Sequence, residues 1–198
     1  LTLTDCSSDN SGKIQGEVLV NGGKFELYSG TITGGVQVGK KGADYQTGSS
    51  FTMYGGAITG NEDYGGVFLV GTTKHIAPPN FTMHGGTITG NTNRGVGVGQ
   101  FGEFNMYGGK ITGNSAGFGG GVYNGGTVNM YGGEISGNSI SNSDAQGGGG
   151  VTIGGQSFTM YGGSISNNSA DYGGGVGWNS YGKFYMYGGE ITDNTATT

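Results

Sequence analysis

The feature that most constrains the fold of this chain is a tandem repeat. The block Phe51-Thr-Met-Tyr-Gly-Gly-Ala-Ile-Thr-Gly-Asn61 recurs with few changes at residues 81–91, 104–114, 128–138, 158–168 and 184–194, and a degenerate first copy spans residues 25–35. All six methionines occupy the third position of a copy, and Leu27 holds this position in the first copy. Successive copies lie 23 to 30 residues apart. A fixed period in this range is typical of solenoid proteins.

The order of residues within one copy predicts a short strand followed by a turn. Phe51 and Met53 are two residues apart, so on a strand they share one face, while Thr52 and Tyr54 share the other. The Gly-Gly pair that follows predicts a sharp turn, because glycine reaches positive φ without steric cost. We therefore expect the phenylalanine and methionine of each copy to point into a core and the tyrosine to point out.

Two more strands complete the predicted coil. Ile58 points inward on the second strand, and Gly60-Asn61 predicts the next turn, with Asn61 in the left-handed region that asparagine tolerates. A third short strand is expected in each copy, namely Val36-Gln-Val38, Val67-Phe-Leu69, Val96-Gly-Val98, Val122-Tyr123, Val151-Thr-Ile153 and Val176-Gly-Trp178. Three strands and three turns give one triangular coil.

No single coil can bury its own apolar face, so identical coils are expected to stack on one another. The prediction is an all-β fold, a right-handed parallel β-helix (β-solenoid) of about seven triangular coils of 23–30 residues. It forms a single domain over residues 1–198, which we expect to be a fragment of a longer repeat protein. A propeller blade needs a longer period, and the Gly-Gly pairs interrupt every candidate helix.

An outward aromatic column is the candidate binding surface. We call it the tyrosine column, and it consists of Tyr28, Tyr54, His84, Tyr107, Tyr131, Tyr161 and Tyr187. Exposed aromatic side chains in one strip can stack on sugar rings or enter a partner surface. The alternative is structural, because cross-strand aromatic pairs also stabilise a sheet. The pattern leaves both readings open.

A second column is predicted to be structural. The asparagine that ends each copy should stack at one corner, with the side-chain amides bonding along the axis and to turn carbonyls. This asparagine ladder consists of Asn61, Asn91, Asn114, Asn138, Asn168 and Asn194.

The sequence has few residues in the patterns that catalysis, metal binding or ice binding require. Glu134 and Glu190 share an outward slot about 10 Å apart by strand spacing, near the separation used by inverting glycosidases, but no pocket is predicted to raise either pKa. The two histidines, His75 and His84, have no metal-ligand spacing around them. Lysine and glutamate interrupt the threonine columns that an ice-binding face would need. We expect no enzyme activity, no cofactor and no metal.

The net charge, the hydropathy and three insertions between the strands bear on the partners of the chain. The chain has 13 acidic and 8 basic residues and a net charge of −5, which gives no electrostatic footprint for nucleic acid. No apolar run is long enough to span a bilayer, so membrane insertion is not expected. Three insertions, at 39–50, 71–80 and 138–150, are either binding loops or solvated excursions, and solvated excursions are the commoner outcome in solenoids.

The repeat block, together with the Gly-Gly-Gly-Val that follows it at Gly119 to Val122, resembles the glycine-rich repeats of large bacterial cell-surface β-helix proteins. These adhesin-like proteins are distantly similar to the polymorphic outer-membrane and autotransporter passenger group. The opening Leu1-Thr-Leu-Thr-Asp-Cys6 resembles the coil that precedes the first full repeat in such proteins.

The resemblance implies an extracellular or cell-surface location and a structural or adhesive scaffold, with glycans or host or cell-surface proteins as partners. The first alternative is a subunit of a head-to-tail fibre, formed by end-to-end self-association. A less favoured alternative is a carbohydrate-active lyase or hydrolase.

Overall fold

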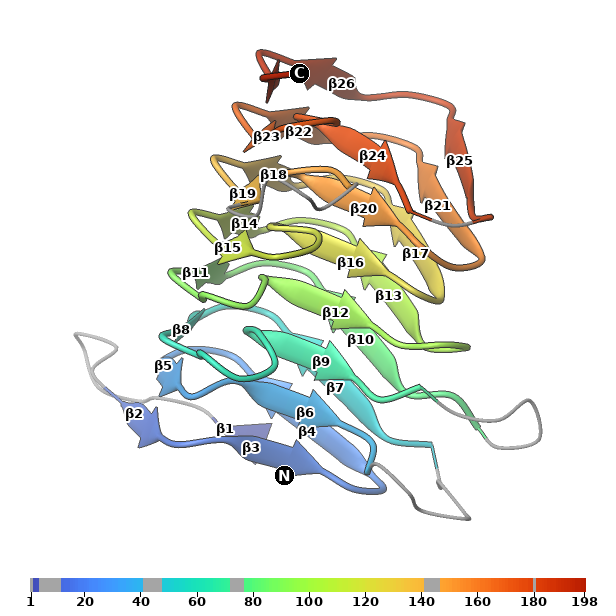
Figure 1. Cartoon of the computed structure of the whole chain (residues 1–198). Helices are drawn as coiled ribbons and strands as arrows, with labels where there is room; N and C mark the ends of the chain where they lie inside the picture. Colours follow the sequence, from blue (N-terminus) through green and yellow to red (C-terminus); the bar gives the residue numbers. More distant parts are fainter. Residues whose placement is uncertain (1, 4–11, 41–47, 72–76, 141–146, 180) are drawn as a thin grey trace.

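The computed structural model describes residues 12–40, 48–71, 77–140, 147–179 and 181–198, with the backbone of residues 2–3. These residues form a parallel β-solenoid of strands and turns without a helix, in which the chain climbs coil by coil from the N-terminal to the C-terminal end (Figure 1). The prediction of an all-β parallel solenoid is confirmed. The centres of the three predicted insertions lie outside the described residues, as do His75 and Cys6.

Four parallel sheets run along the axis of the solenoid, each taking one strand from successive coils. Sheet A contains β1 (Thr2–Leu3), β4 (Lys24–Leu27), β7 (Ser50–Met53), β10 (Asn80–Met83), β13 (Glu103–Met106), β17 (Thr127–Met130), β21 (Ser157–Met160) and β25 (Lys183–Met186). Sheet B contains β2 (Lys13–Gln15), β5 (Thr31–Thr33), β8 (Ala57–Thr59), β11 (Thr87–Thr89), β14 (Lys110–Thr112), β18 (Glu134–Ser136), β22 (Ser164–Ser166) and β26 (Glu190–Thr192). Sheet C contains β3 (Val18–Val20), β6 (Val36–Val38), β9 (Val67–Leu69), β12 (Val96–Val98), β16 (Val122–Asn124), β20 (Val151–Ile153) and β24 (Val176–Trp178). Sheet D contains β15 (Ser115–Ala116), β19 (Ser139–Ile140), β23 (Ser169–Ala170) and β27 (Thr195–Ala196).

The register places like residues on like residues, which builds the core. Phe81 lies between Phe51 and Phe104, and Met83 pairs in the same way with the methionines of the adjacent strands. Phe51, Phe81 and Phe104 are fully buried, and neighbouring phenylalanine rings stack at 4.8 to 4.9 Å. Burial of each such side chain contributes about 1.5–3 kcal/mol. The inward assignment of phenylalanine, methionine and isoleucine is confirmed.

The prediction that the ladder asparagine occupies the left-handed region is wrong. Positive φ belongs to the residue before it, which is Gly60 (70°) in an early coil and Asn167 (55°) or Asp193 (54°) in the last coils. Asn168 is buried, whereas Asn167 is exposed. The residue with positive φ therefore precedes the ladder asparagine. The asparagine itself must point inward to reach its hydrogen-bond partners.

The prediction of three strands per coil is wrong for the later coils, where sheet D adds a fourth side. Sheet D forms where the second residue after the ladder asparagine is small or apolar and can be buried, as at Ala116, Ile140 and Ala170. At the same position in earlier coils stand the polar Asp63 and Asn93, which gain nothing from burial. Sequence analysis also missed β2 and β3, which lie outside the repeat block and precede the first copy.

Candidate functional site

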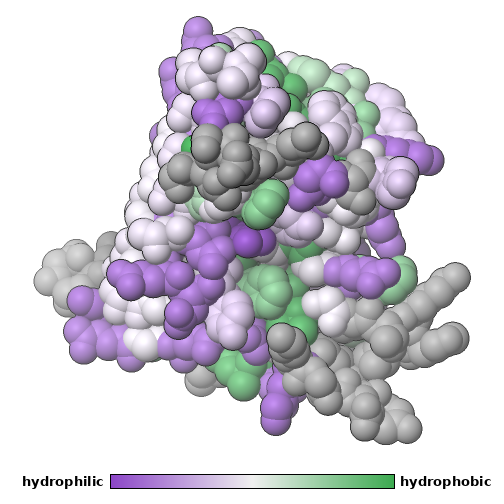
Figure 2. All heavy atoms as spheres, viewed as in Figure 1, coloured by the Kyte–Doolittle hydropathy of each residue, from purple (hydrophilic) through white to green (hydrophobic). Residues whose placement is uncertain are grey.

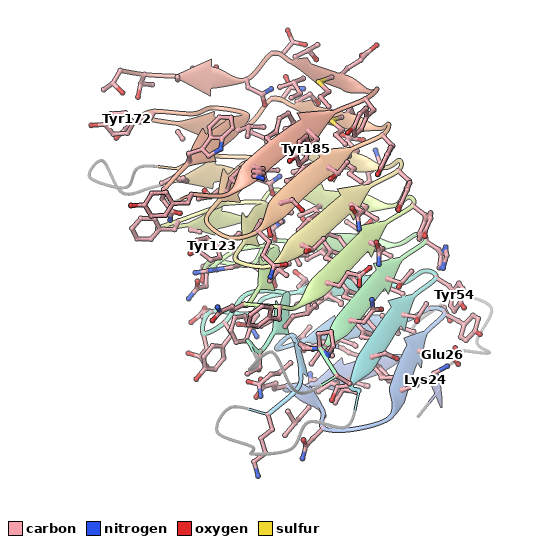
Figure 3. All side chains as sticks on the ribbon, turned by 90° about the vertical axis from the view of Figure 1, so that its right-hand side faces the viewer. Lys24, Glu26, Tyr54, Tyr123, Tyr172 and Tyr185 are labelled. Carbon is pink, nitrogen blue, oxygen red and sulfur yellow. The ribbon has the colours of Figure 1, made fainter. Side chains whose placement is uncertain are left out.

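The tyrosine column follows sheet A, each ring standing one residue beyond an inward Met or Leu. Tyr54 points away from the body of the solenoid at the edge of this sheet (Figure 3). Successive ring centroids along the column are 4.6 to 5.5 Å apart and the rings are nearly parallel, with interplanar angles of 4 to 16°. The tyrosines of the column remain 42 to 72% exposed. The column is therefore one continuous, solvent-facing stack of aromatic rings.

This stacking decides what the column can bind. Each inner ring is covered on both faces by its neighbours, as Tyr107 is by His84 and Tyr131. Stacking on a sugar needs a free ring face, and among the described residues only the end rings, Tyr28 and Tyr187, stack on a single neighbour. The inner rings present their edges and phenol oxygens to solvent. Such a strip offers apolar contact and hydrogen bonds together.

Two phenols of the column, those of Tyr28 and Tyr131, have raised pKa values. The pKa of Tyr131 is raised above its usual value of 10.0 by burial and by the neighbouring phenols of Tyr107 and Tyr161. The pKa of Tyr28 is raised by burial and by the carboxylate of Glu26. The phenols can therefore donate as well as accept hydrogen bonds.

A row of amide and hydroxyl side chains runs beside the tyrosine column on sheet A. The Asn129 Nδ2 donates to Asn105 Oδ1 at 2.9 Å, and Asn105 Nδ2 donates to Glu103 Oε1 at 2.7 Å. Thr52 and Thr82 occupy the same outward row in earlier coils. The outer face of sheet A thus combines ring edges with amides, hydroxyls and the carboxylates of Glu26 and Glu103.

The asparagine ladder, in contrast to this outward row, is buried inside the solenoid. Asn114 Oδ1 accepts from the Asn91 backbone N–H at 3.1 Å and from Asn91 Nδ2 at 2.8 Å. Asn114 Nδ2 donates to the Ile88 carbonyl and to Asn138 Oδ1, both at 3.0 Å. Asn91, Asn114 and Asn138 are at most 1% exposed. These amides satisfy backbone groups of adjacent coils and have no access to a ligand.

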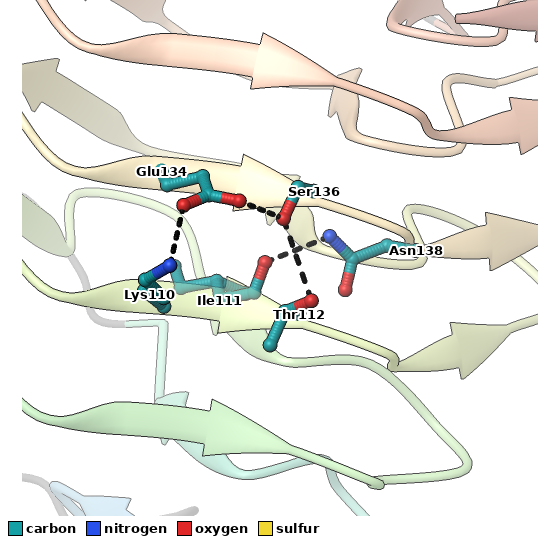
Figure 4. Close-up of polar contacts among 6 residues, drawn as sticks. All are labelled: Lys110, Ile111, Thr112, Glu134, Ser136 and Asn138. Carbon is teal, nitrogen blue, oxygen red and sulfur yellow. Dashed lines mark hydrogen bonds and ion pairs between the residues drawn. The ribbon is translucent and has the colours of Figure 1, made fainter.

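The carboxylate pair considered for catalysis is not arranged for it. Glu134 Oε2 lies 2.9 Å from Lys110 Nζ, and Glu134 Oε1 accepts from Ser136 Oγ at 2.5 Å (Figure 4). These contacts, first the Ser136 hydrogen bond and then Lys110, lower the pKa of Glu134. A general acid needs a raised pKa. Glu190 stands two coils further along sheet B, with Ser164 between, and is exposed.

His84 lies within the tyrosine column, between Tyr54 and Tyr107 at 5.1 Å from each. Within the described ranges, no three histidine, cysteine, aspartate or glutamate side chains gather where they could hold a metal ion. The same ranges contain no helix long and apolar enough to cross a membrane.

The outer face of sheet C carries a cluster that sequence analysis missed. Tyr64 stacks on Phe68 at 5.7 Å, and the guanidinium carbon of Arg94 lies 5.1 Å from the ring centroid of Tyr123. Hydrophobic residues gather over the lower half of this face, bordered by hydrophilic ones (Figure 2). Leu19, half exposed, contributes to them. The signal was weak, because the outward residue of this strand follows no repeated pattern from coil to coil.

Comparison with known proteins found no matching family model, no matching curated protein and no matching solved structure.

Proposed function

We propose that this chain is a non-catalytic structural and adhesive module of a bacterial cell-surface protein, and that the tyrosine column is its contact surface. The observation that carries the proposal is the exposed stack of rings along the whole of sheet A. A rigid strip of aromatic edges and phenols on a soluble domain is characteristic of interaction surfaces. The glycine-rich repeat, similar to adhesin-like surface proteins, supports the location outside the cell.

A protein surface fits the column better than a sugar does. The inner ring faces are occupied by neighbouring rings, so a sugar could reach only edges and phenols there. A protein partner can pack side chains along the edges and accept hydrogen bonds from the phenols. Tyrosine provides large contact area at low entropic cost, because its side chain has few rotatable bonds.

The handedness of the solenoid and the number of its coils are part of the proposal. We infer a right-handed solenoid of about seven coils, since crossovers between parallel strands of one sheet are right-handed in almost all proteins. A crystal structure of the chain tests this directly. A left-handed path or a different coil number would contradict it.

Binding by the column is tested with three variants of the whole chain. The unmodified chain and each variant are immobilised on a biosensor, and the binding of extracellular matrix proteins and of purified outer-membrane proteins is measured. Replacing Tyr107, Tyr131 and Tyr161 together by Ala removes three neighbouring rings and should abolish binding. Replacing the same three by Phe keeps the stack and removes the phenols, so binding should weaken without being lost.

The control changes a partly exposed outward surface away from the column. Thr59, Thr89 and Thr112 lie on the outer face of sheet B, and their replacement by Ser should leave binding unchanged. Circular dichroism confirms that each variant is folded. If the triple Ala variant is folded and still binds like the unmodified chain, the column is not the contact surface.

A fibre subunit is the second candidate, supported by the last coil. Met186 and Ile191 are 46% and 37% exposed, although the equivalent side chains of the coil before are fully buried. Their apolar faces and the free edges of β25 and β26 would be covered by another coil stacked on them. That coil belongs either to the same polypeptide or to a second copy, which would propagate as a filament.

Sedimentation of the chain at rising concentration separates these cases. Association that Met186→Lys prevents would support the fibre. A chain that stays monomeric at high concentration would exclude it and leave the adhesive module unaffected.

A further inference from the structure

A hollow lies at the corner where the chain passes from sheet C to sheet A, and it spans three successive coils. It is lined by Tyr123, Gln100, Gln156 and corner glycines that include Gly125 and Gly154, and it encloses about 450 Å³. Small-molecule sites commonly occupy about 300–1,000 Å³. The hollow and the tyrosine column lie at opposite ends of the sheet A strands. Figure 3 shows Tyr123, on β16 of sheet C, far from Tyr54, which follows β7 of sheet A.

The hollow arises because its middle corner is the shortest. Only Gly125 and Gly126 separate β16 from β17, whereas residues 99–102 and 154–156 form the corners of the coils on either side. Asn124, a polar residue in an otherwise apolar inward column, accepts a hydrogen bond from the Gly126 N–H at 3.1 Å. A Cβ on Gly155 would lie 2.1 Å from the Gly125 carbonyl oxygen. The short corner is thus fixed by a buried amide and by close coil packing.

The ring in the hollow is held in place from the preceding coil. The Arg94 guanidinium lies over Tyr123 at 5.1 Å from the ring centroid. Gly97 makes room for this crossing, because a Cβ there would lie 2.9 Å from Phe68 and 3.1 Å from Arg94 Cδ. Unlike the inner rings of the tyrosine column, Tyr123 stacks on no other aromatic ring among the described residues.

Two amide side chains flank this ring, one from each neighbouring coil. Gln156 Oε1 accepts from Thr127 Oγ1 at 2.9 Å, which fixes the amide and leaves its Nε2 to donate elsewhere. The Gln100 side chain has no hydrogen-bond partner among the described residues. An amide both donates and accepts. The residues that line the hollow carry no charge, and the Arg94 guanidinium contacts the Tyr123 ring without lining the hollow itself.

We propose that this hollow binds a neutral saccharide. Sugar hydroxyls both donate and accept, so they match the two amides, and the C–H groups of a sugar ring match an aromatic wall. No charged side chain lines the hollow, and Arg94 is engaged with the Tyr123 ring, so the lining favours a neutral sugar over an acidic or amino sugar. This site is independent of the tyrosine column, whose partner is a protein.

The test is a titration of the ¹⁵N-labelled whole chain followed by amide NMR. The probes are cellotetraose, mannotetraose and N-acetylated chitotetraose, with adenosine as a comparison ligand whose flat base can stack on the ring without offering an oligosaccharide. We expect at least one tetrasaccharide to shift the Gly125 and Gly154 amides and the side-chain signals of Gln100 and Gln156. Gln100→Ala with Gln156→Ala should weaken that binding at least about tenfold, because the hydrogen bonds of two amides are lost.

The matched control is the triple Ala variant of the tyrosine column, which should bind the tetrasaccharide like the unmodified chain. Loss of sugar binding in that variant would move the site to the column. The proposal is also overturned if no tetrasaccharide shifts the hollow, if the double Gln variant binds unchanged, or if only adenosine binds. Both Gln positions lie outside the core, and the amide spectrum of the double variant reports whether it is folded.

Discussion

Corner glycines of this solenoid have different steric surroundings although their backbone conformations are alike. Gly60 and Gly86 both have positive φ, at 70° and 85°. A Cβ on Gly60 would meet nothing within 4 Å, whereas on Gly86 it would lie 2.5 Å from Met53 Cε and 2.8 Å from the Gly56 carbonyl oxygen. Only the second glycine is required by the coil beneath it.

This difference predicts unequal effects of alanine. Gly60→Ala should cost about 1–2 kcal/mol, the strain of a left-handed alanine. Gly86→Ala carries the same strain and adds a clash with backbone, so it should cost about 1–3 kcal/mol more. Urea unfolding of both variants measures the difference. Equal losses would mean that conformation alone, and not coil packing, selects glycine at these corners.

The asparagine ladder predicts a second contrast between residues of the same type. Asn114→Ala leaves the buried Asn91 N–H and the Ile88 carbonyl without their partners, and it should destabilise the fold by about 2–4 kcal/mol. Asn105, in the same coil, points outward and bonds only side chains. Asn105→Ala should therefore change the free energy of unfolding by less than about 1 kcal/mol. A large loss in the outward variant would contradict the assignment of faces.

At the scale of elements, the Lys110–Glu134 pair links β14 to β18 and makes stability depend on pH. The pKa of Glu134 is lowered in the folded state from its usual 4.5, so the pair stabilises the fold above that pH. The stabilisation is lost as the pH falls through the lowered, folded-state pKa. Both side chains are partly exposed, at 59% for lysine and 33% for glutamate, so the effect should stay within about 1 kcal/mol.

Glu134→Gln removes this dependence. Between pH 7 and acid pH, the unmodified chain should lose more stability than this variant, measured by urea unfolding across the pH range. Glu190→Gln, in the same outward slot without an ion pair among the described residues, is the control and should follow the unmodified chain. Parallel curves for all three proteins would show that the ion pair contributes nothing.

The sequence predicted sheets A, B and C because each repeats a two-residue alternation in a fixed order. Sheet D escaped prediction because its two-residue strands are too short to show a period, although Ala116 and Ala170 stand at equivalent places. The position of each tyrosine was predictable, but its stacking was not, since ring orientation depends on side-chain packing between coils. The hollow beside Tyr123 arises from unequal corner lengths in three coils, which no single repeat reveals.

In the whole molecule, every coil contributes inward side chains that hold the fold and outward side chains that face solvent. Sheets A and B run from the first described strands to the last coil without interruption, so all coils share one core. An inward change in a middle coil should therefore affect the stability of the entire solenoid, while an outward change should not. Solenoids transmit such effects through contacts between neighbouring coils.

The most direct test compares two neighbours on β13. Met106 is fully buried and Asn105 is half-buried on the opposite face of the strand. Met106→Asp buries an unpaired carboxylate, so thermal unfolding followed by circular dichroism should show the solenoid melted or its midpoint greatly lowered. Asn105→Asp loses the hydrogen bond to Glu103 and sets two partly solvated carboxylates together, so its midpoint should fall far less than that of Met106→Asp. Similar midpoints for the two variants would contradict the division into inward and outward columns.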